Sequence, residues 1–259
     1  MRASDKKRVY ILDIIRGILI IYVVYYHFMY DLNDILGYEI PYLYADWFST
    51  IRDCMSGSLI FISGISCNLS RNNIKRGART ALIALVLSIA TIVVMPSQSI
   101  IFGILHLLGT MMLLYGIGEY IAGRISDKKD TSMPLRIVLM FVFLIMFFVC
   151  RDVYYGWLIF GNFRLYMPQS LYGGSNGFLY IMGFWQRLSS ADYYPLIPWG
   201  FLFLAGAMAG HVFKSEKLPR FLYRNFCPPL AFIGRHTMII YLAHQPILLG
   251  IFMLAQKLV

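Results

Sequence analysis

Long apolar runs separated by short charged segments dominate this chain. Hydrophobic residues make up 59% of its 259 residues and charged residues only 14%, and the mean hydropathy is +0.64. Because a run of about 20 apolar residues matches the hydrocarbon core of a bilayer, this pattern predicts an all-α, polytopic helical membrane protein. The length suits one integral domain over residues 1–259 and leaves no room for a separate soluble domain.

We expect about seven membrane-spanning helices, over residues 9–30, 48–69, 79–95, 100–122, 135–150, 195–213 and 232–255. A long aromatic, glycine-rich stretch lies between the fifth and the sixth of these helices. Its apolar segment at residues 178–184 is too short to span a bilayer, which favours a re-entrant or interfacial position.

Loop charges predict the orientation. Sixteen cations fall in one set of loops: Arg2, Lys6, Lys7, Arg8, Arg71, Lys75, Arg76, Arg79, Arg124, Lys128, Lys129, Arg136, Lys214, Lys217, Arg220 and Arg224. Five fall in the opposite set: Arg52, Arg151, Arg164, Arg187 and Lys257. Since cytoplasmic loops are enriched in Lys and Arg, the N-terminus is expected in the cytoplasm and the C-terminus outside. This bias explains the net charge of +10 without a nucleic-acid partner. The start is charged and offers no cleavage site, so the first helix is expected to act as its own signal anchor.

The four cysteines do not have the short spacing of a zinc site, and we expect no metal. Cys54 and Cys150 fall near the outer ends of their helices, which leaves a disulfide between them open. The sequence also has no phosphate-binding glycine loop and no serine nucleophile elbow.

The first helix carries the strongest functional signal, because Arg16 and His27 lie eleven positions apart inside an apolar span. Their backbones are roughly 16 Å apart along the axis, about half of the hydrocarbon thickness. Ionisable groups at such depth usually face a protein interior or a watery cavity and mark function. The alternative is that Arg16 snorkels and His27 is interfacial. Asp13 is spaced to form an ion pair with Arg16, and Asp31 is spaced to orient the imidazole of His27.

Further polar residues can be placed by depth. His106 lies in the outer half of the fourth helix, at a depth similar to that of His27. Arg235 sits at the inner mouth of the last helix, His244 lies about two turns deeper, and His211 is expected at the cytoplasmic interface. Inner cations suit the phosphates of a cytoplasmic acyl-CoA, and an outer histidine suits the general base that an extracytoplasmic acceptor needs.

Four motifs in order carry a family resemblance. They are Asp13 to Gly17 with His27, the run FGILHLLG, the segment from Asp192 to Trp199, and the run GRHTMIIYLAHQP from Gly234 to Pro246. Together they resemble the bacterial branch of the heparan-alpha-glucosaminide N-acetyltransferase catalytic-domain family, over nearly the whole chain. The Arg-to-His spacing and the final Tyr-Leu-x-His-Gln-Pro run are also similar to the acyltransferase 3 family of integral membrane sugar O-acyltransferases.

The resemblance implies a transmembrane acyltransferase of the bacterial-type plasma membrane. It would move an acyl group, most simply acetyl, from acetyl-CoA to an amine or hydroxyl of an extracytoplasmic sugar or glycan. The protein would be surrounded by membrane lipid, and the resemblance is compatible with a homodimer. We assign His27 as the base, oriented by Asp31, with His106 as second candidate. The donor would be held by Arg16, Arg235 and His244. The acceptor side would be lined by Asp53, Asp192 and Trp199, although Asp53 can instead form a local pair with Arg52.

The chain departs from the lysosomal enzyme of this family, whose catalytic histidine lies in the outer loop after the first helix. Residues 31–47 of this chain contain no histidine. The position of His27 matches the acyltransferase 3 histidine instead. Two other functional classes stay open: a proton-coupled or small-molecule transporter with a His/Arg relay, and a non-catalytic assembly partner.

Overall fold

The structure is a computed structural model that describes residues 8–125, 132–215 and 218–258, without the side chains of residues 35 and 256–258. Six of the cations used above for orientation lie outside the described residues: Arg2, Lys6, Lys7, Lys128, Lys129 and Lys217. The side chain of Lys257 also lies outside them.

The chain is mostly helical, as the apolar pattern predicts. The long helices are α1 (Tyr10–Leu36), α2 (Asp46–Cys67), α3 (Asn73–Val94), α4 (Ile104–Ile125), α5 (Met133–Val149), α7 (Leu196–Lys214) and α9 (Thr237–Leu258). The shorter helices are α6 (Gly177–Met182) and α8 (Pro228–Arg235). The 3₁₀ turns are η1 (Pro41–Tyr44), η2 (Pro96–Gln98), η3 (Val153–Tyr155), η4 (Gln169–Leu171) and η5 (Arg220–Tyr223). One hairpin joins β1 (Trp157–Phe160) to β2 (Phe163–Tyr166).

Within the described residues, six helices are long and apolar enough to cross a membrane: α1, α3, α4, α5, α7 and α9. They confirm a polytopic helical membrane protein. The remaining expected span corresponds to α2, whose 22 residues extend roughly 33 Å. Asp46, Arg52 and Asp53 make its first two turns more polar than the other long helices.

Two compact units divide the chain, and each is described by itself. The first joins the chain before Ser63 to the chain after Ser215. In it, α1 packs along α8 and α9. The α1–α8 contact depends on two glycines, because a Cβ added at Gly17 would collide with the backbone of Leu230, and one at Gly234 would collide with the backbone of Asp13. Small residues of this kind let membrane helices approach at backbone distance.

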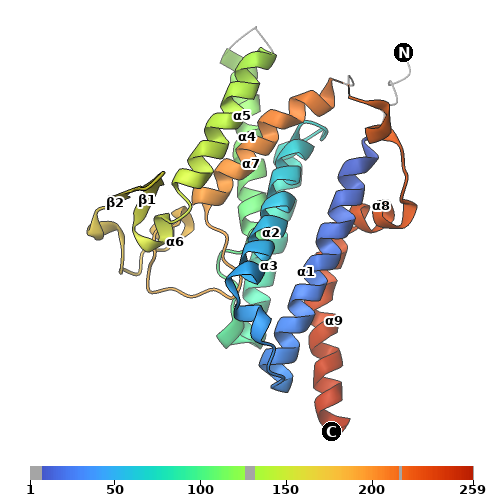
Figure 1. Ribbon diagram of the computed structural model, residues 1–259, viewed down its shortest axis with the longest axis vertical. Coiled ribbons are helices and arrows are strands. Elements are labelled where there is room, and N and C mark those ends of the chain that lie inside the picture. The colour runs from blue at the N-terminus through green and yellow to red at the C-terminus, as the bar shows by residue number, and fades with distance from the viewer. Residues whose placement is uncertain (1–7, 126–131, 216–217, 259) are drawn as a thin grey trace. The chain divides into compact units, whose positions relative to one another are not determined.

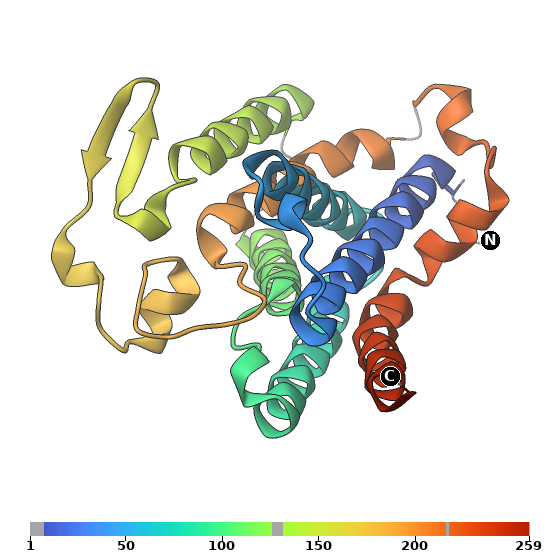
Figure 2. The same cartoon turned by 60° about the horizontal axis from the view of Figure 1, so that its bottom comes forward.

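The second unit runs from Ser63 to Ser215 and is built from two helix pairs. α3 packs on α4 and α5 packs on α7, and both views show α5 beside α7 (Figures 1 and 2). Gly116 of α4 lies against Ile74 of α3, and Arg136 of α5 contacts His211 of α7. The cation-bearing ends of these four helices therefore meet at one end of the unit.

The third helix begins earlier than expected. The side chain of Asn72 accepts a hydrogen bond from the backbone N–H of Lys75 at 2.8 Å, which caps α3 at its N-terminus. Lys75, Arg76 and Arg79 therefore lie in the first turns of a helix and not in a loop.

The expected helix at residues 232–255 is two helices, because α8 ends at Arg235 and α9 begins at Thr237. The reason is local. The imidazole Nδ1 of His236 donates to the carbonyl of Phe232 at 2.8 Å, and the hydroxyl of Thr237 donates to the carbonyl of Gly234 at 2.7 Å. Side chains that bind these carbonyls compete with the regular helix ladder.

Between α5 and α7 the structure has a β-hairpin that the helical reading of the sequence did not predict. The strands pair Trp157 with Tyr166 and Phe160 with Phe163. The turn between them contains Gly161 at φ +59°, a conformation that glycine adopts without steric cost. The short apolar segment expected at residues 178–184 is the six-residue helix α6.

Candidate active site

His27 and His244 lie side by side in the first unit. Their ring centroids are 4.9 Å apart, with the rings inclined at 55°. His27 comes from α1 and His244 from α9, so the two histidines are brought together by the packing of the two ends of the chain. The sequence placed His27 at the acceptor side and His244 at the donor side, whereas here they form one pair.

The ring of His244 has a defined tautomer. Its Nδ1 lies 2.6 Å from the carbonyl oxygen of Tyr241. A carbonyl can only accept, so Nδ1 carries the hydrogen and Nε2 of the neutral ring carries the lone pair. Among the described residues, this Nε2 is buried and has no hydrogen-bond partner.

Asp31 is a buried carboxylate, with a relative exposure of 5%. It accepts hydrogen bonds from the Nε2 amide of Gln245, at 3.1 Å to one oxygen and 3.0 Å to the other. The hydrogen-bond partner of this carboxylate is therefore Gln245. The hydrogen bond from His27 to Asp31 that the sequence predicts is not seen among the described residues. The amide oxygen of Gln245 is buried and, like Nε2 of His244, lacks a partner within the described chain.

Asp13 organises the first turns of α1. It is 5% exposed and accepts from Nε of Arg8 at 2.6 Å and from Nη1 of Arg16 at 3.3 Å. The ion pair expected between Asp13 and Arg16 is confirmed. The hydrogen bond to Asp13 raises the pKa of Arg8. Two cations thus converge on one buried carboxylate.

Arg235 lies at the same level of the first unit as Arg16. Gly234 lies against the backbone of Gly17. Arg235 directly follows Gly234 in the chain, and Arg16 directly precedes Gly17. Arg235 is exposed, and its guanidinium lies 5.7 Å from the ring centroid of Phe232. Two further buried polar atoms without a partner among the described residues, Tyr223 Oη and Asn225 Oδ1, lie in the segment that leads into α8. Of these two atoms, the Tyr223 hydroxyl can donate to a phosphate, whereas the Asn225 Oδ1 oxygen can only accept. This end of the unit therefore combines cations with one unused donor.

His106 belongs to the second unit, and both of its nitrogens are engaged. Nδ1 accepts from the backbone N–H of Gly103 at 3.2 Å, so the hydrogen resides on Nε2, which lies 3.0 Å from the hydroxyl oxygen of Ser88. That hydroxyl in turn donates to the carbonyl of Ile100 at 2.6 Å. This arrangement closes the start of α4 and leaves no lone pair on the neutral ring for a substrate proton.

Asp192 lies beside the same helix start. It accepts from the backbone N–H of Ile104 at 3.0 Å, a position that stabilises a helix N-terminus. Trp199 packs between Phe147 and Tyr194, with ring centroids 5.4 and 5.1 Å away. Asp192 lies in the segment that precedes α7, and Trp199 lies in the first turn of α7 itself.

Two tyrosines hold the segment that precedes α7 in place. The hydroxyl of Tyr193 donates to the carbonyl of Tyr180 at 2.6 Å, and their ring centroids are 4.4 Å apart. Burial raises the pKa of Tyr180 to about 12. Burial and the neighbouring Tyr180 also raise the pKa of Tyr193.

Asp53 forms the local pair that the sequence left open. Its Oδ1 accepts from Nε and Nη2 of Arg52 at 3.1 and 3.0 Å, and both side chains are more than a third exposed.

All four cysteines are free, with Cys54 exposed and Cys150 partly exposed.

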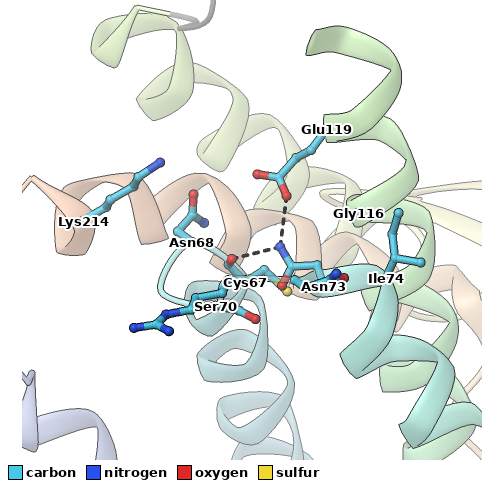
Figure 3. Close-up of a pocket in the computed structure, with 10 residues that line it drawn as sticks. Cys67, Asn68, Ser70, Asn73, Ile74, Gly116, Glu119 and Lys214 are labelled. Carbon is cyan, nitrogen blue, oxygen red and sulfur yellow. Dashed lines mark hydrogen bonds between the residues drawn. The ribbon is translucent and has the colours of Figure 1, made fainter. Parts of the chain in front are cut away.

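A polar pocket of about 360 Å³ lies in the second unit, where α2 ends and α3 begins (Figure 3). Figure 3 shows Glu119 of α4 and Asn73 of α3 pointing toward one another, with the amide of Asn73 donating to the carboxylate at 2.9 Å. Lys214 borders the pocket from α7. None of the site residues expected from the sequence lines this pocket.

Sequence reasoning missed Gln245 and the carbonyl of Tyr241. Gln245 is part of the quoted Tyr-Leu-x-His-Gln-Pro run, so the run itself was the available signal. Its partner Asp31 is 214 residues away in sequence, which no local pattern could reveal.

The sequence model of one protein family, described as "Heparan-alpha-glucosaminide N-acetyltransferase, catalytic", matches residues 8–246. This match covers α1 to the first half of α9 and includes every candidate site residue described above. Searches of curated proteins and of solved structures gave no match.

Proposed function

Because the chain belongs to the heparan-alpha-glucosaminide N-acetyltransferase catalytic family, we propose that it moves an acetyl group from cytoplasmic acetyl-CoA to an amine or hydroxyl of an extracytoplasmic sugar or glycan. Membership implies a membrane-bound acetyltransferase, and the six candidate spans make it a multi-pass integral membrane protein. The matched range crosses both compact units, which supports a single functional domain.

One observation carries the proposal: the paired rings of His27 and His244, with Nε2 of His244 buried and unpartnered among the described residues. A buried nitrogen lone pair without a partner is costly in a structural role, since such atoms are normally satisfied. It suits a group that accepts a proton during a reaction.

In the proposed reaction, the acceptor oxygen or nitrogen attacks the acetyl carbonyl of the thioester. We assign His27 as the base that takes the proton from the attacking group, and the buried Nε2 of His244 beside it can share that proton. The carbonyl–sulfur bond breaks and CoA leaves as the thiolate, which takes the proton from the histidine pair, so that the pair returns to its neutral form. No covalent intermediate on the protein is needed.

The donor would be held at the inner end of the first unit. Arg16 and Arg235 supply cations for its phosphates, and Tyr223 adds a hydroxyl that can donate to them. Asp53, Asp192 and Trp199 remain proposed acceptor residues, but their recorded contacts give each of them a structural role as well.

Two finer assignments belong to the proposal. The Arg16-to-His27 spacing is similar to that of the acyltransferase 3 family and supports His27 as the base. The resemblance to the bacterial branch supports a bacterial-type plasma membrane, and the cation asymmetry of the loops supports a cytoplasmic N-terminus.

The test is acetyl transfer by the purified protein in lipid nanodiscs. Labelled acetyl-CoA is supplied with glucosamine, other amino sugars and neutral sugars, and CoA thiol release is measured with and without each acceptor. Acceptor-dependent release with labelled product supports the proposal. Acetyl-CoA binding without transfer to any acceptor, in protein whose fold is verified, would contradict it.

Variants then locate the base. His27→Gln and His244→Gln are each expected to lower turnover by about 10²- to 10⁴-fold, because glutamine keeps polarity but cannot take a proton near neutral pH. His236→Gln is the matched control, since that ring is held by the carbonyl of Phe232 in the adjoining turn. Near-normal turnover in both His27→Gln and His244→Gln would remove the pair from the mechanism.

A further inference from the structure

The hairpin of β1 and β2 has two chemically different faces. Residues directly opposite in an antiparallel pair point to the same side, and successive residues alternate. The observed register therefore places Leu158, Phe160, Phe163 and Leu165 on one face, which we call the apolar face. Phe160, Phe163 and Leu165 are 50%, 64% and 47% exposed. Neither polar nor charged side chains interrupt this face.

The opposite face carries Trp157, Arg164 and Tyr166 together with Ile159, and it is organised by its own contacts. The guanidinium of Arg164 lies 5.2 Å from the ring centroid of Trp157. The indole N–H of Trp157 donates to the carboxylate of Asp152 at 3.1 Å, and its ring packs against Tyr166. Trp, Tyr and Arg in this combination are typical of the layer where a bilayer meets water.

The hairpin begins where a membrane span ends. Helix α5 is the most apolar of the candidate spans, and none of its most apolar window is buried inside the protein. Its exposed side chains, such as Phe141 and Phe148, therefore face lipid. Only seven residues separate Val149 at the end of α5 from Trp157 at the start of β1. Both ribbon views show the hairpin projecting from the end of α5 at the edge of its unit (Figures 1 and 2).

The depth of the hairpin follows from its backbone. The sheet has two strands, so each strand has one edge whose N–H and C=O groups pair with no other strand in the sheet. Unpaired backbone groups are too costly in the hydrocarbon core. At the level of the headgroups, water and phosphates can satisfy them while the apolar face enters the upper acyl chains. Exposed Arg151, Arg164 and Arg187 in this region provide cations for the phosphates.

We propose that this hairpin is an interfacial membrane anchor, which lies on the phospholipid surface at the α5 exit with its apolar face in the acyl chains and with Trp157, Arg164 and Tyr166 among the headgroups. The lipid is the occupant favoured by the continuity with the exposed surface of α5 and by the surrounding arginines. This inference does not depend on the proposed enzymatic activity.

The first test uses single-cysteine variants in which Cys54, Cys67, Cys150 and Cys227 are replaced by serine. A fluorophore is attached at Phe163→Cys on the apolar face or at Tyr166→Cys on the opposite face, and the protein is placed in phospholipid nanodiscs. Acyl-chain spin labels should quench the probe at position 163 more strongly than the probe at 166. Headgroup spin labels should reverse this order.

Equal quenching of both probes by a water-soluble agent, without quenching from the acyl chains, would overturn the anchor. Cross-linking between two copies through position 163, without lipid quenching, would also overturn it and assign the face to a second copy of the chain. Specific protection of the opposite face by an added oligosaccharide, with no lipid contact, would overturn it in favour of a glycan platform.

The second test uses the unmodified protein, so that a folding defect cannot decide the result. A phospholipid that carries a photoreactive diazirine in its acyl chain is added to the nanodiscs, and labelled peptides are mapped by mass spectrometry. Label on residues 158, 160, 163 and 165 supports the anchor. Label confined to the spanning helices, with none on the hairpin, would contradict it.

Discussion

The carboxylate of Asp31 and the side-chain amide of Gln245 are joined by hydrogen bonds at 3.1 and 3.0 Å across 214 residues of sequence. One amide group serves both oxygens of a buried carboxylate. This contact fixes α9 against α1 one residue away from His244. The positions of the two histidines therefore depend on it.

Gln245→Leu is expected to destabilise the protein by about 1–3 kcal/mol or more, because it leaves a buried carboxylate without its donor. Thermal unfolding in nanodiscs measures the loss. Asp31→Asn in the Gln245→Leu background removes the charge and should recover part of it, giving a coupling energy between the two sites. Strictly additive effects would show that the contact contributes nothing of its own.

His106→Gln is expected to lower stability while turnover per folded molecule stays within a few-fold of the original. The reason is that both nitrogens of His106 are engaged at the start of α4, by Gly103 and Ser88. Turnover normalised to folded protein and thermal unfolding are measured together. A fully folded but inactive His106→Gln protein would return His106 to the list of candidate bases.

Arg16→Ala is expected to weaken acetyl-CoA binding by about 10- to 150-fold, the range of one lost charge-assisted contact worth roughly 1.5–3 kcal/mol. Equilibrium binding of labelled acetyl-CoA measures it. Arg8→Ala is the matched control, because Arg8 also pairs with Asp13 and its loss leaves the same carboxylate with one cation fewer. Equal weakening in both variants would mean that the effect comes from Asp13 and not from phosphate contact.

Gly17→Val is expected to destabilise the first unit by about 1–3 kcal/mol or more, since the added carbons meet the backbone of Leu230. Gly250→Ala in α9 is the control. A Cβ at Gly250 meets no described atom within 4 Å, so alanine should be neutral or stabilising by up to about 1 kcal/mol. Thermal unfolding of both variants checks this, and a tolerated valine at position 17 would contradict the backbone contact of α1 with α8.

Labelling of introduced cysteines tests the orientation. A cysteine at Lys75, at the cation-rich end of the second unit, should react with a membrane-impermeant reagent only after permeabilisation. A cysteine at Ser175 should react in intact cells. Lys128, in the loop between α4 and α5, lies outside the described residues, and Lys75 is the described cation at the same end of the unit. The reverse pattern would invert the donor and acceptor sides.

The long helices could be predicted from apolar run length alone, because lipid allows few other structures. The start of α3 could not, since it depends on one cap by Asn72. The break at His236 depends on two side chains that bind helix carbonyls. The hairpin was missed because its apolar residues lie beside aromatic ones, which blurs the alternation that marks a strand.

The candidate site was predictable in part. Depth and charge identified His27, Asp31 and His244 from the sequence, because ionisable residues are rare in spans. Their pairing was not predictable: His244 with His27 and Asp31 with Gln245 are contacts between the two ends of the chain. The engagement of His106 by Ser88 likewise depends on how α3 packs beside α4.

The first unit is formed by segments from opposite ends of the chain, and this fixes the order in which its contacts can form during biosynthesis. When α1 leaves the ribosome, the donor that will satisfy Asp31 is still 214 residues from being made. At about 5–20 residues per second, α1 spends on the order of 10–40 s in the membrane before the donor to Asp31 is made. Truncation before α8 should therefore yield a first helix that is degraded instead of a stable half-protein.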